Sequence, residues 1–246
     1  MEKDADRILS DLEERLKFFR DIGADFIFKS ESSSIPGSSI PEGASPCPPS
    51  SPSGGLSEAA SDIQTIHAEI LRCRKCPLAA ERTQSVPGEG NFRAELMFVG
   101  EGPGHDEDAQ GRPFVGRAGQ LLTKIIQAMK FDRAEVFITN IVKCRPPNNR
   151  VPHRDEVDIC SPYLIEQIKN IRPKVIVTLG KSATDFFVPD SMGGMTAIRG
   201  RFYEWRGIPV MPTFHPSYLI RNEGNKALKR MVWDDMRMVM ARLGKK

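Results

Sequence analysis

Four of the five cysteines in this chain have a spacing that could hold a metal. Cys73 and Cys76 form a C-x-x-C pair, and Cys144 and Cys160 follow with 15 residues between them. A C-x-x-C pair brings two thiolates to one metal from a single turn, and four thiolates satisfy either a tetrahedral zinc ion or a cubane iron–sulfur cluster. Because the second pair is not C-x-x-C, a compact zinc ribbon is less favoured. Spacing alone leaves zinc, a cluster and ordinary buried cysteines open.

A glycine-rich loop, GEGPG at positions 100–104, directly follows an apolar run and brings backbone close to a ligand. It matches neither of the common phosphate-loop patterns, so a nucleotide-phosphate site is a weak interpretation. The loop also supplies the Glu101 carboxylate, and the Phe114 ring follows it in the sequence. Backbone donors, a carboxylate and an aromatic face suit a planar, uncharged, hydrogen-bonding ligand such as a nucleobase.

Two other loops carry side chains that could read a base or touch DNA. Asn140 both donates and accepts hydrogen bonds, as the edge of a pyrimidine requires, with a turn or cap role as an equal alternative. His215 is a candidate for hydrogen-bond chemistry, against a structural histidine. Lys143, Arg145 and Arg150 follow Asn140, and they are either part of a solvated face or contacts to DNA phosphates. After His215, Ser217 is either a phosphate contact or a helix cap. Tyr218 and Leu219 either form a wedge into the base stack or are core residues.

Short apolar runs alternate with amphipathic segments in the second part of the chain, which predicts parallel strands joined by helical crossovers. Strands are expected at 95–99, 135–139, 174–179 and 208–212, and helices at 118–129, 155–171, 182–187 and 226–243. A further helix is expected to start at Ser61, as its N-cap, and to run toward Cys73. Each strand ends in a loop of unusual chemistry. Because ligands of open α/β sheets bind at the carboxyl ends of the strands, these loops should converge on one site.

The composition excludes several classes of protein. With 246 residues, 39% hydrophobic and 27% charged, the chain is neither a short disulfide-stapled peptide nor fully disordered. It has no apolar run of about 18 residues, and its first residues are too charged for a secretory signal. We therefore expect a cytoplasmic protein without a membrane segment, in which cysteines serve as metal ligands or free thiols. Cys47 is expected to be a free thiol.

Composition and charge divide the chain into three parts. Residues 1–28 contain an amphipathic helix, residues 29–58 read as a disordered linker rich in Ser, Pro and Gly, and residues 59–246 form the folded domain. Through Glu58 the chain has 6 Lys/Arg against 11 Asp/Glu, a net charge of −5, whereas the remainder has 29 against 21, a net charge of +8. The basic domain is therefore the part expected to meet a polyanion.

Taken together, the motifs resemble those of the family 4 uracil-DNA glycosylases, which carry a [4Fe–4S] cluster. The resemblance rests on GEGPG…ED…GRPFVGRAGQLL, TNIVKCRPPNNR and FHPSYLIR and on the cysteine spacing, and it covers roughly residues 63–243. It implies a three-layer α/β/α fold around a short, mainly parallel sheet. It also implies uracil-containing DNA, single- or double-stranded, as substrate, with the cluster bound by Cys73, Cys76, Cys144 and Cys160.

The resemblance implies roles for individual residues. Uracil would be recognised by Gly100, Glu101 and Gly102 in the first loop, by stacking on Phe114, by the amide of Asn140, and by His215 through the uracil O2. His215 would stabilise the uracil anion that leaves, and Glu101 would position water. Better-known family 1 relatives have an aspartate and a tyrosine where this chain has Gly102 and Gly104, so we expect Glu107 to help close the pocket near C5.

Two alternatives keep the fold but change the activity. A related subgroup traps uracil-DNA covalently through a histidine in a basic inserted loop; His153 lies in the corresponding region here, but the insertion is missing. The other alternative is a non-enzymatic iron–sulfur DNA-binding module. Catalytic turnover is the favoured hypothesis. We expect a monomer, and its N-terminal helix is the candidate contact for a replication or repair protein.

Overall fold

Six strands form one sheet at the centre of the fold. The computed structural model describes residues 55–189 and 191–245, and its strands are β1 (Glu89–Gly90), β2 (Leu96–Gly100), β3 (Phe137–Asn140), β4 (Val175–Leu179), β5 (Tyr203–Trp205) and β6 (Ile208–Thr213). Their order across the sheet is β1-β3-β2-β4-β6-β5. The four inner strands are parallel, and each edge strand runs antiparallel to its neighbour. The prediction of a short, mainly parallel sheet is confirmed.

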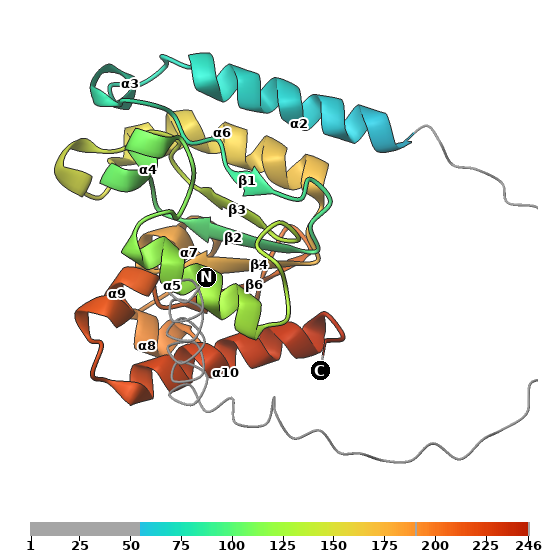
Figure 1. Cartoon of the computed structure of the whole chain (residues 1–246), viewed down its shortest axis with the longest axis vertical. Coiled ribbons are helices and arrows are strands. Elements are labelled where there is room, and N and C mark those ends of the chain that lie inside the picture. Colours follow the sequence, from blue (N-terminus) through green and yellow to red (C-terminus); the bar gives the residue numbers. More distant parts are fainter. Residues whose placement is uncertain (1–54, 190, 246) are drawn as a thin grey trace, which may run out of the picture.

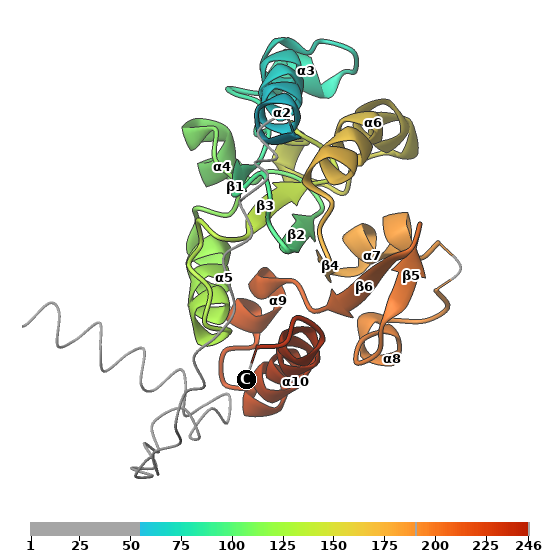
Figure 2. The ribbon, with the colours of Figure 1, turned by 90° about the vertical axis from the view of Figure 1, so that its right-hand side faces the viewer.

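Helices cover both faces of this sheet, which gives three layers (Figures 1 and 2). In chain order they are α2 (Gly55–Arg72), α3 (Leu78–Glu81), α4 (His105–Gln110), α5 (Arg117–Ala128), the 3-10 turn η2 (Pro147–Asn149), α6 (Arg154–Ile171), α7 (Lys181–Phe187), α8 (Met195–Ile198), α9 (Pro216–Arg221) and α10 (Lys226–Arg242). Figure 1 shows α2 and α6 on one side of the sheet and α5 and α10 on the other. The predicted α/β/α architecture is confirmed.

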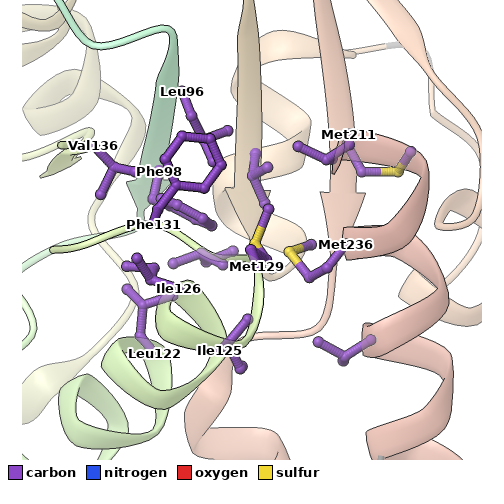
Figure 3. Close-up of a cluster of buried hydrophobic side chains, with 14 of the residues drawn as sticks. Leu96, Phe98, Leu122, Ile125, Ile126, Met129, Phe131, Val136, Met211 and Met236 are labelled. Carbon is purple, nitrogen blue, oxygen red and sulfur yellow. The ribbon is translucent and has the colours of Figure 1, made fainter. Parts of the chain in front are cut away.

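Alternation along the strands builds a separate apolar core on each face. In β2, Leu96 and Phe98 belong to the core under α5 and α10, whereas Met97 and Val99 belong to the core under α2 and α6. Successive side chains of a strand point to opposite faces, so a continuous apolar run is what a strand buried on both sides needs. Figure 3 shows part of the first core, with side chains of α5 directed toward β2.

The four predicted strands and the helices that connect them lie within two residues of their expected positions. Strands β1 and β5 were not predicted, since stretches of two and three residues carry no readable alternation. Helix α2 begins at Gly55, six residues before the expected N-cap Ser61, so the end of the predicted linker is helical.

Two features predicted near the N-terminus, the amphipathic helix within residues 1–28 and the linker up to residue 54, lie outside the described residues, as does Cys47. Among the helices that are described, none combines the length and the apolar character needed to cross a membrane.

Candidate functional site

The loops that follow β2, β3, β4 and β6 meet in one pocket at the carboxyl ends of these strands. Its volume is about 480 Å³, within the range of about 300–1,000 Å³ that is usual for small-molecule sites. Its walls include Glu101 to Gly104, Phe114, Asn140, Gly180 to Ser182 and His215. The expectation that the strand-end loops converge is therefore confirmed, and Phe114, Asn140 and His215 share one cavity.

Asn140 is the most informative side chain of this pocket. It is the last residue of β3 and is 1% exposed, yet its Oδ1 has no hydrogen-bond partner. Leaving a buried acceptor unpaired costs about 1–3 kcal/mol, so an amide in this position indicates a ligand that donates to it. Parallel pairing places Gly100 beside Asn140, and a Cβ at Gly100 would lie 2.3 Å from that Oδ1. The glycine therefore keeps the space in front of the amide open.

Phe114 forms another wall and is held there by Glu107. Phe114 has φ of 51°, a left-handed backbone that a bulky residue rarely adopts. The Glu107 carboxylate accepts hydrogen bonds from the backbone N–H groups of Val115 (2.9 Å) and Gly116 (3.1 Å), directly after Phe114, and from that of Gly104 (3.1 Å). Glu107 thus lines the pocket and also ties the glycine-rich loop to the segment that carries the ring.

The geometry around His215 identifies its tautomer. His215 follows β6 and caps α9, and its Nδ1 accepts the backbone N–H of Ser217 at 3.1 Å, with the Ser217 hydroxyl 2.7 Å away. Because Nδ1 accepts, the ring proton is on Nε2. Burial, with a further contribution from Arg221, lowers the pKa of His215 to about 4, so the ring is neutral at pH 7. The Phe114 and His215 ring centroids are 5.7 Å apart.

Basic side chains line the mouth of the pocket. Arg150 donates to both oxygens of Glu156 (2.7 and 2.6 Å), and Lys181 bonds to Asp185. The part of the chain that the structure describes contains no such carboxylate partner for the exposed Arg221. Lys181, Ser182 and Arg221 were not singled out from the sequence. Two signals were present, the LGKS loop at a strand end and the arginine that closes FHPSYLIR.

Two of the predicted DNA contacts are wrong. Lys143 is 1% exposed, and its Nζ donates to Thr139 Oγ1 (2.7 Å), the Asn140 carbonyl (2.7 Å) and Gln167 Oε1 (2.8 Å), so it cannot reach DNA. Leu219 is 3% exposed and packs in the core under α5 and α10 instead of forming a wedge. Tyr218 beside it remains 38% exposed and stacks on Phe214, with ring centroids 5.2 Å apart.

The remaining predicted site residues divide between the pocket and its surroundings. Glu101, Gly102, Arg150 and Ser217 line the pocket, whereas Gly100 lies behind its wall. Arg145 is partly exposed and donates to Asn149 Oδ1 at 2.7 Å. His153, the histidine of the trapping alternative, is exposed and does not line the pocket.

The four cysteines of the folded domain line a second, smaller cavity between α2 and α6. All four are free thiols; Cys144 and Cys160 are buried, and Cys73 and Cys76 partly so. Burial raises the pKa of Cys160 to about 11 and also raises those of Cys76 and Cys144. Over residues 55–189 and 191–245, no three cysteine, histidine or acidic side chains converge on a point where one metal ion could bind.

Donors from the protein already point at two of these sulfurs. The Arg82 guanidinium donates to Cys144 Sγ at 2.8 Å and also to the carbonyl of Cys73 at 2.8 Å. The backbone N–H of Lys143 donates to Cys160 Sγ at 3.3 Å. Such donors stabilise thiolate sulfur, and hydrogen bonds to sulfur are among the features that tune metal–thiolate clusters.

Comparison with known proteins identifies similar sequences. Residues 87–237 match the model of a family described as the uracil DNA glycosylase superfamily. A type-4 uracil-DNA glycosylase of Thermotoga maritima is 47% identical over 71% of this chain and 91% of its own length. One from Saccharolobus solfataricus is 44% identical over 75% and 88%. A type-5 uracil-DNA glycosylase of Pyrobaculum aerophilum is 33% identical over 66% and 85%.

Proposed function

This chain belongs to the type-4 group of the uracil-DNA glycosylase superfamily, and we propose that its strand-end pocket binds a uracil flipped out of DNA. The enzyme hydrolyses the bond between uracil and deoxyribose and leaves an abasic site, the first step of base excision repair. The observation that carries the pocket assignment is the unpaired Asn140 Oδ1, buried in a cavity walled by Phe114 and His215. A base stays in a duplex until it is extruded, which is why a glycosylase needs such a cavity.

Asn140 gives the pocket its selectivity. Uracil has a proton on N3 that donates to Oδ1, whereas the N3 of cytosine is itself an acceptor and would leave Oδ1 unpaired. The ring of Phe114 supplies the stacking surface, and Gly100 leaves room for the base edge. Backbone groups of Glu101 and Gly102 complete the contacts from the first loop.

His215 acts on the leaving group. When the C1′–N1 bond breaks, its electron pair stays on the base, and the resulting uracil anion shares negative charge between N1 and O2. The Nε2–H of the neutral His215 donates to O2 and stabilises that charge as it develops. The tautomer needed for this is the one that the Ser217 backbone N–H imposes on Nδ1.

Glu101 is our candidate for the residue that positions the water that completes the reaction. Its carboxylate is in the pocket wall on the loop after β2. The water attacks C1′ on the face opposite to the departing base, its oxygen bonds to the sugar and its proton is released, while the uracil anion takes up a proton. Glu107, whose carboxylate binds three backbone N–H groups, acts as the wall near C5 and keeps Phe114 in place.

Cys73, Cys76, Cys144 and Cys160 would hold a [4Fe–4S] cluster. A cavity walled by four thiols and supplied with donors from Arg82 and the Lys143 amide fits a polynuclear cluster better than one tetrahedral ion. Such a cluster, when bound, cross-links the segment after α2 to the segment after β3 and to α6. None of the catalytic steps above depends on it.

Arg221 is proposed to contact a phosphate beside the flipped uracil, together with Arg145, Arg150, Ser217 and Tyr218 around the pocket mouth. Replacing Arg221 by glutamine is expected to raise KM for uracil-containing DNA with little change in kcat, because an exposed rim cation binds phosphate and not the reacting atoms. The slope of log affinity against log salt concentration should become shallower by about one, the change expected for the loss of one phosphate contact. Titrations at several salt concentrations measure both.

Arg206 provides the control for this prediction. It is exposed in the turn before β6, at the end of that strand opposite to His215, so Arg206→Gln removes the same charge far from the pocket. An equal loss of affinity in both variants would show that only net charge matters and would remove Arg221 from the site.

The function is tested with a uracil-containing single-stranded oligonucleotide, whose products are separated with and without alkali. Free uracil and an alkali-sensitive strand are expected. A protein–DNA adduct that survives denaturation would favour covalent trapping, and retarded but intact DNA would favour a binding module. The exposed position of His153 outside the pocket does not support trapping.

A further inference from the structure

The ammonium group of Lys143 is buried, and none of its described hydrogen-bond partners is a carboxylate. Its three protons bond to a threonine hydroxyl, a backbone carbonyl and a glutamine oxygen, all of them neutral acceptors, and in the described part of the chain no ion pair is formed by it. Taking a charge out of water costs several kcal/mol unless an opposite charge compensates for it. Lys143 therefore indicates an anion close by that the carboxylates of the described residues do not supply.

The cysteine cavity is where that anion belongs. Lys143 is among the residues that line this cavity, it directly precedes Cys144, and its backbone N–H donates to Cys160 Sγ. Four thiolates around an iron–sulfur core carry net negative charge. The Lys143 side chain thus lies against a group of the proposed holoenzyme whose negative charge can balance its own.

The same ammonium also binds the backbone of a residue that lines the uracil pocket. It donates to the carbonyl oxygen of Asn140 and to the hydroxyl of Thr139, the last two residues of β3. Gln167 of α6 accepts the third bond and anchors itself to the carbonyl of Pro87 at 2.7 Å. One side chain therefore connects the cysteine cavity to the backbone of the residue whose amide faces the base.

We propose that Lys143 is the internal countercharge of the cluster and a positioning residue for Asn140, so that the cluster's charge holds the base-reading amide in place. The proposal rests on the cluster proposed above. Loss of the cluster leaves the ammonium buried without compensation, which favours its movement toward water and releases the carbonyl of Asn140. The cluster acts here through its charge, and no electron transfer is involved.

The test compares Lys143→Met with Lys75→Met in protein purified with its cluster. Lys75 also directly precedes a cysteine ligand, Cys76, but its side chain is exposed and solvent screens its charge. Visible absorbance of the wild-type protein first establishes that the cluster is present; a colourless protein would refute the cofactor and leave the pocket chemistry untouched. Voltammetry then gives the reduction potential of each variant.

We expect Lys143→Met to have a clearly more negative potential than the wild-type protein, because a nearby positive charge favours the reduced cluster. Lys75→Met should shift the potential much less. The Ki of free uracil should rise in Lys143→Met and stay unchanged in Lys75→Met, since only Lys143 holds Asn140. A cluster potential in Lys143→Met that equals that of the wild-type protein or of Lys75→Met overturns the countercharge, and an unchanged Ki overturns the positioning role.

A second variant keeps the test decisive if Lys143→Met does not fold. Gln167→Glu has nearly the same shape and places a carboxylate 2.8 Å from the ammonium, at the position of the present oxygen, while it removes the hydrogen bond to the Pro87 carbonyl. Lys143 then has a counter-ion of its own, so the potential should again become more negative while the cluster is retained. An unchanged potential in folded, cluster-loaded Gln167→Glu would contradict the proposal.

Discussion

Replacing His215 by alanine is expected to lower kcat for uracil release about 100-fold, with little loss of affinity for uracil-containing DNA. The Nε2–H donates to an oxygen that becomes fully charged only as the glycosidic bond breaks, and one such donor contributes about 3 kcal/mol to transition-state stabilisation. Single-turnover rates with a labelled oligonucleotide measure the first quantity, and equilibrium binding to the same DNA measures the second. An equal loss of both would contradict the assignment.

The control is His153→Ala, which removes an exposed imidazole outside the pocket and should leave the rate unchanged. The pH dependence gives an independent check. Burial lowers the pKa of His215 to about 4, so the active neutral form is already complete above about pH 5 and its contribution is lost only as the pH falls through about 4. Protonation of Nδ1 there would remove the acceptor for the Ser217 N–H.

Gly100→Ala is expected to reduce uracil excision by at least about 100-fold. The added Cβ would lie 2.3 Å from Asn140 Oδ1 and 2.6 Å from Cζ of Phe114, far inside van der Waals contact. Either the amide or the ring has to move, and a displacement of about 1 Å in a catalytic site costs about two orders of magnitude in rate. Rates under single-turnover conditions, together with the Ki of free uracil, measure the effect.

Gly194→Ala is the matched control because a Cβ there meets nothing within 4 Å and its φ of −82° suits alanine. Overpacking at Gly100 also lowers the free energy of unfolding, by about 1–3 kcal/mol, so both variants are assayed well below their melting temperatures. Activity of Gly100→Ala within a few-fold of the wild-type protein would show that Asn140 and Phe114 do not face the base as proposed.

The sequence predicted the parts of this site that depend on strand ends. A buried parallel strand is a continuous apolar run, and the residue after it must lie at the carboxyl edge of the sheet, which is why Asn140 and His215 could be placed together before any coordinates. The same reasoning failed for Lys143 and Leu219. Whether such side chains are buried depends on the direction in which they point relative to the core. Lys143 follows a strand in a loop and Leu219 lies in a helix of six residues, and neither segment is long enough to show a hydrophobic period from which that direction could be predicted.

Other features depend on contacts between distant segments and were not predictable. Arg82 reaches Cys144 across 62 positions of sequence, and Glu107 recognises backbone groups up to nine residues away. The role of Arg221 emerges only after Arg150 is found bonded to Glu156 of α6, and Lys181 to Asp185 of its own helix α7. Which cation remains available for a ligand is a property of pairings in three dimensions, not of residue type.

The short strands at the two margins of the sheet affect how copies of the enzyme behave toward one another. β1 spans two residues and β5 three, and each runs against the direction of the parallel strands that it borders. Little unpaired backbone is left along either margin to serve as a template for another chain. Strand pairing between the described sheets of two copies therefore has little free backbone from which to start.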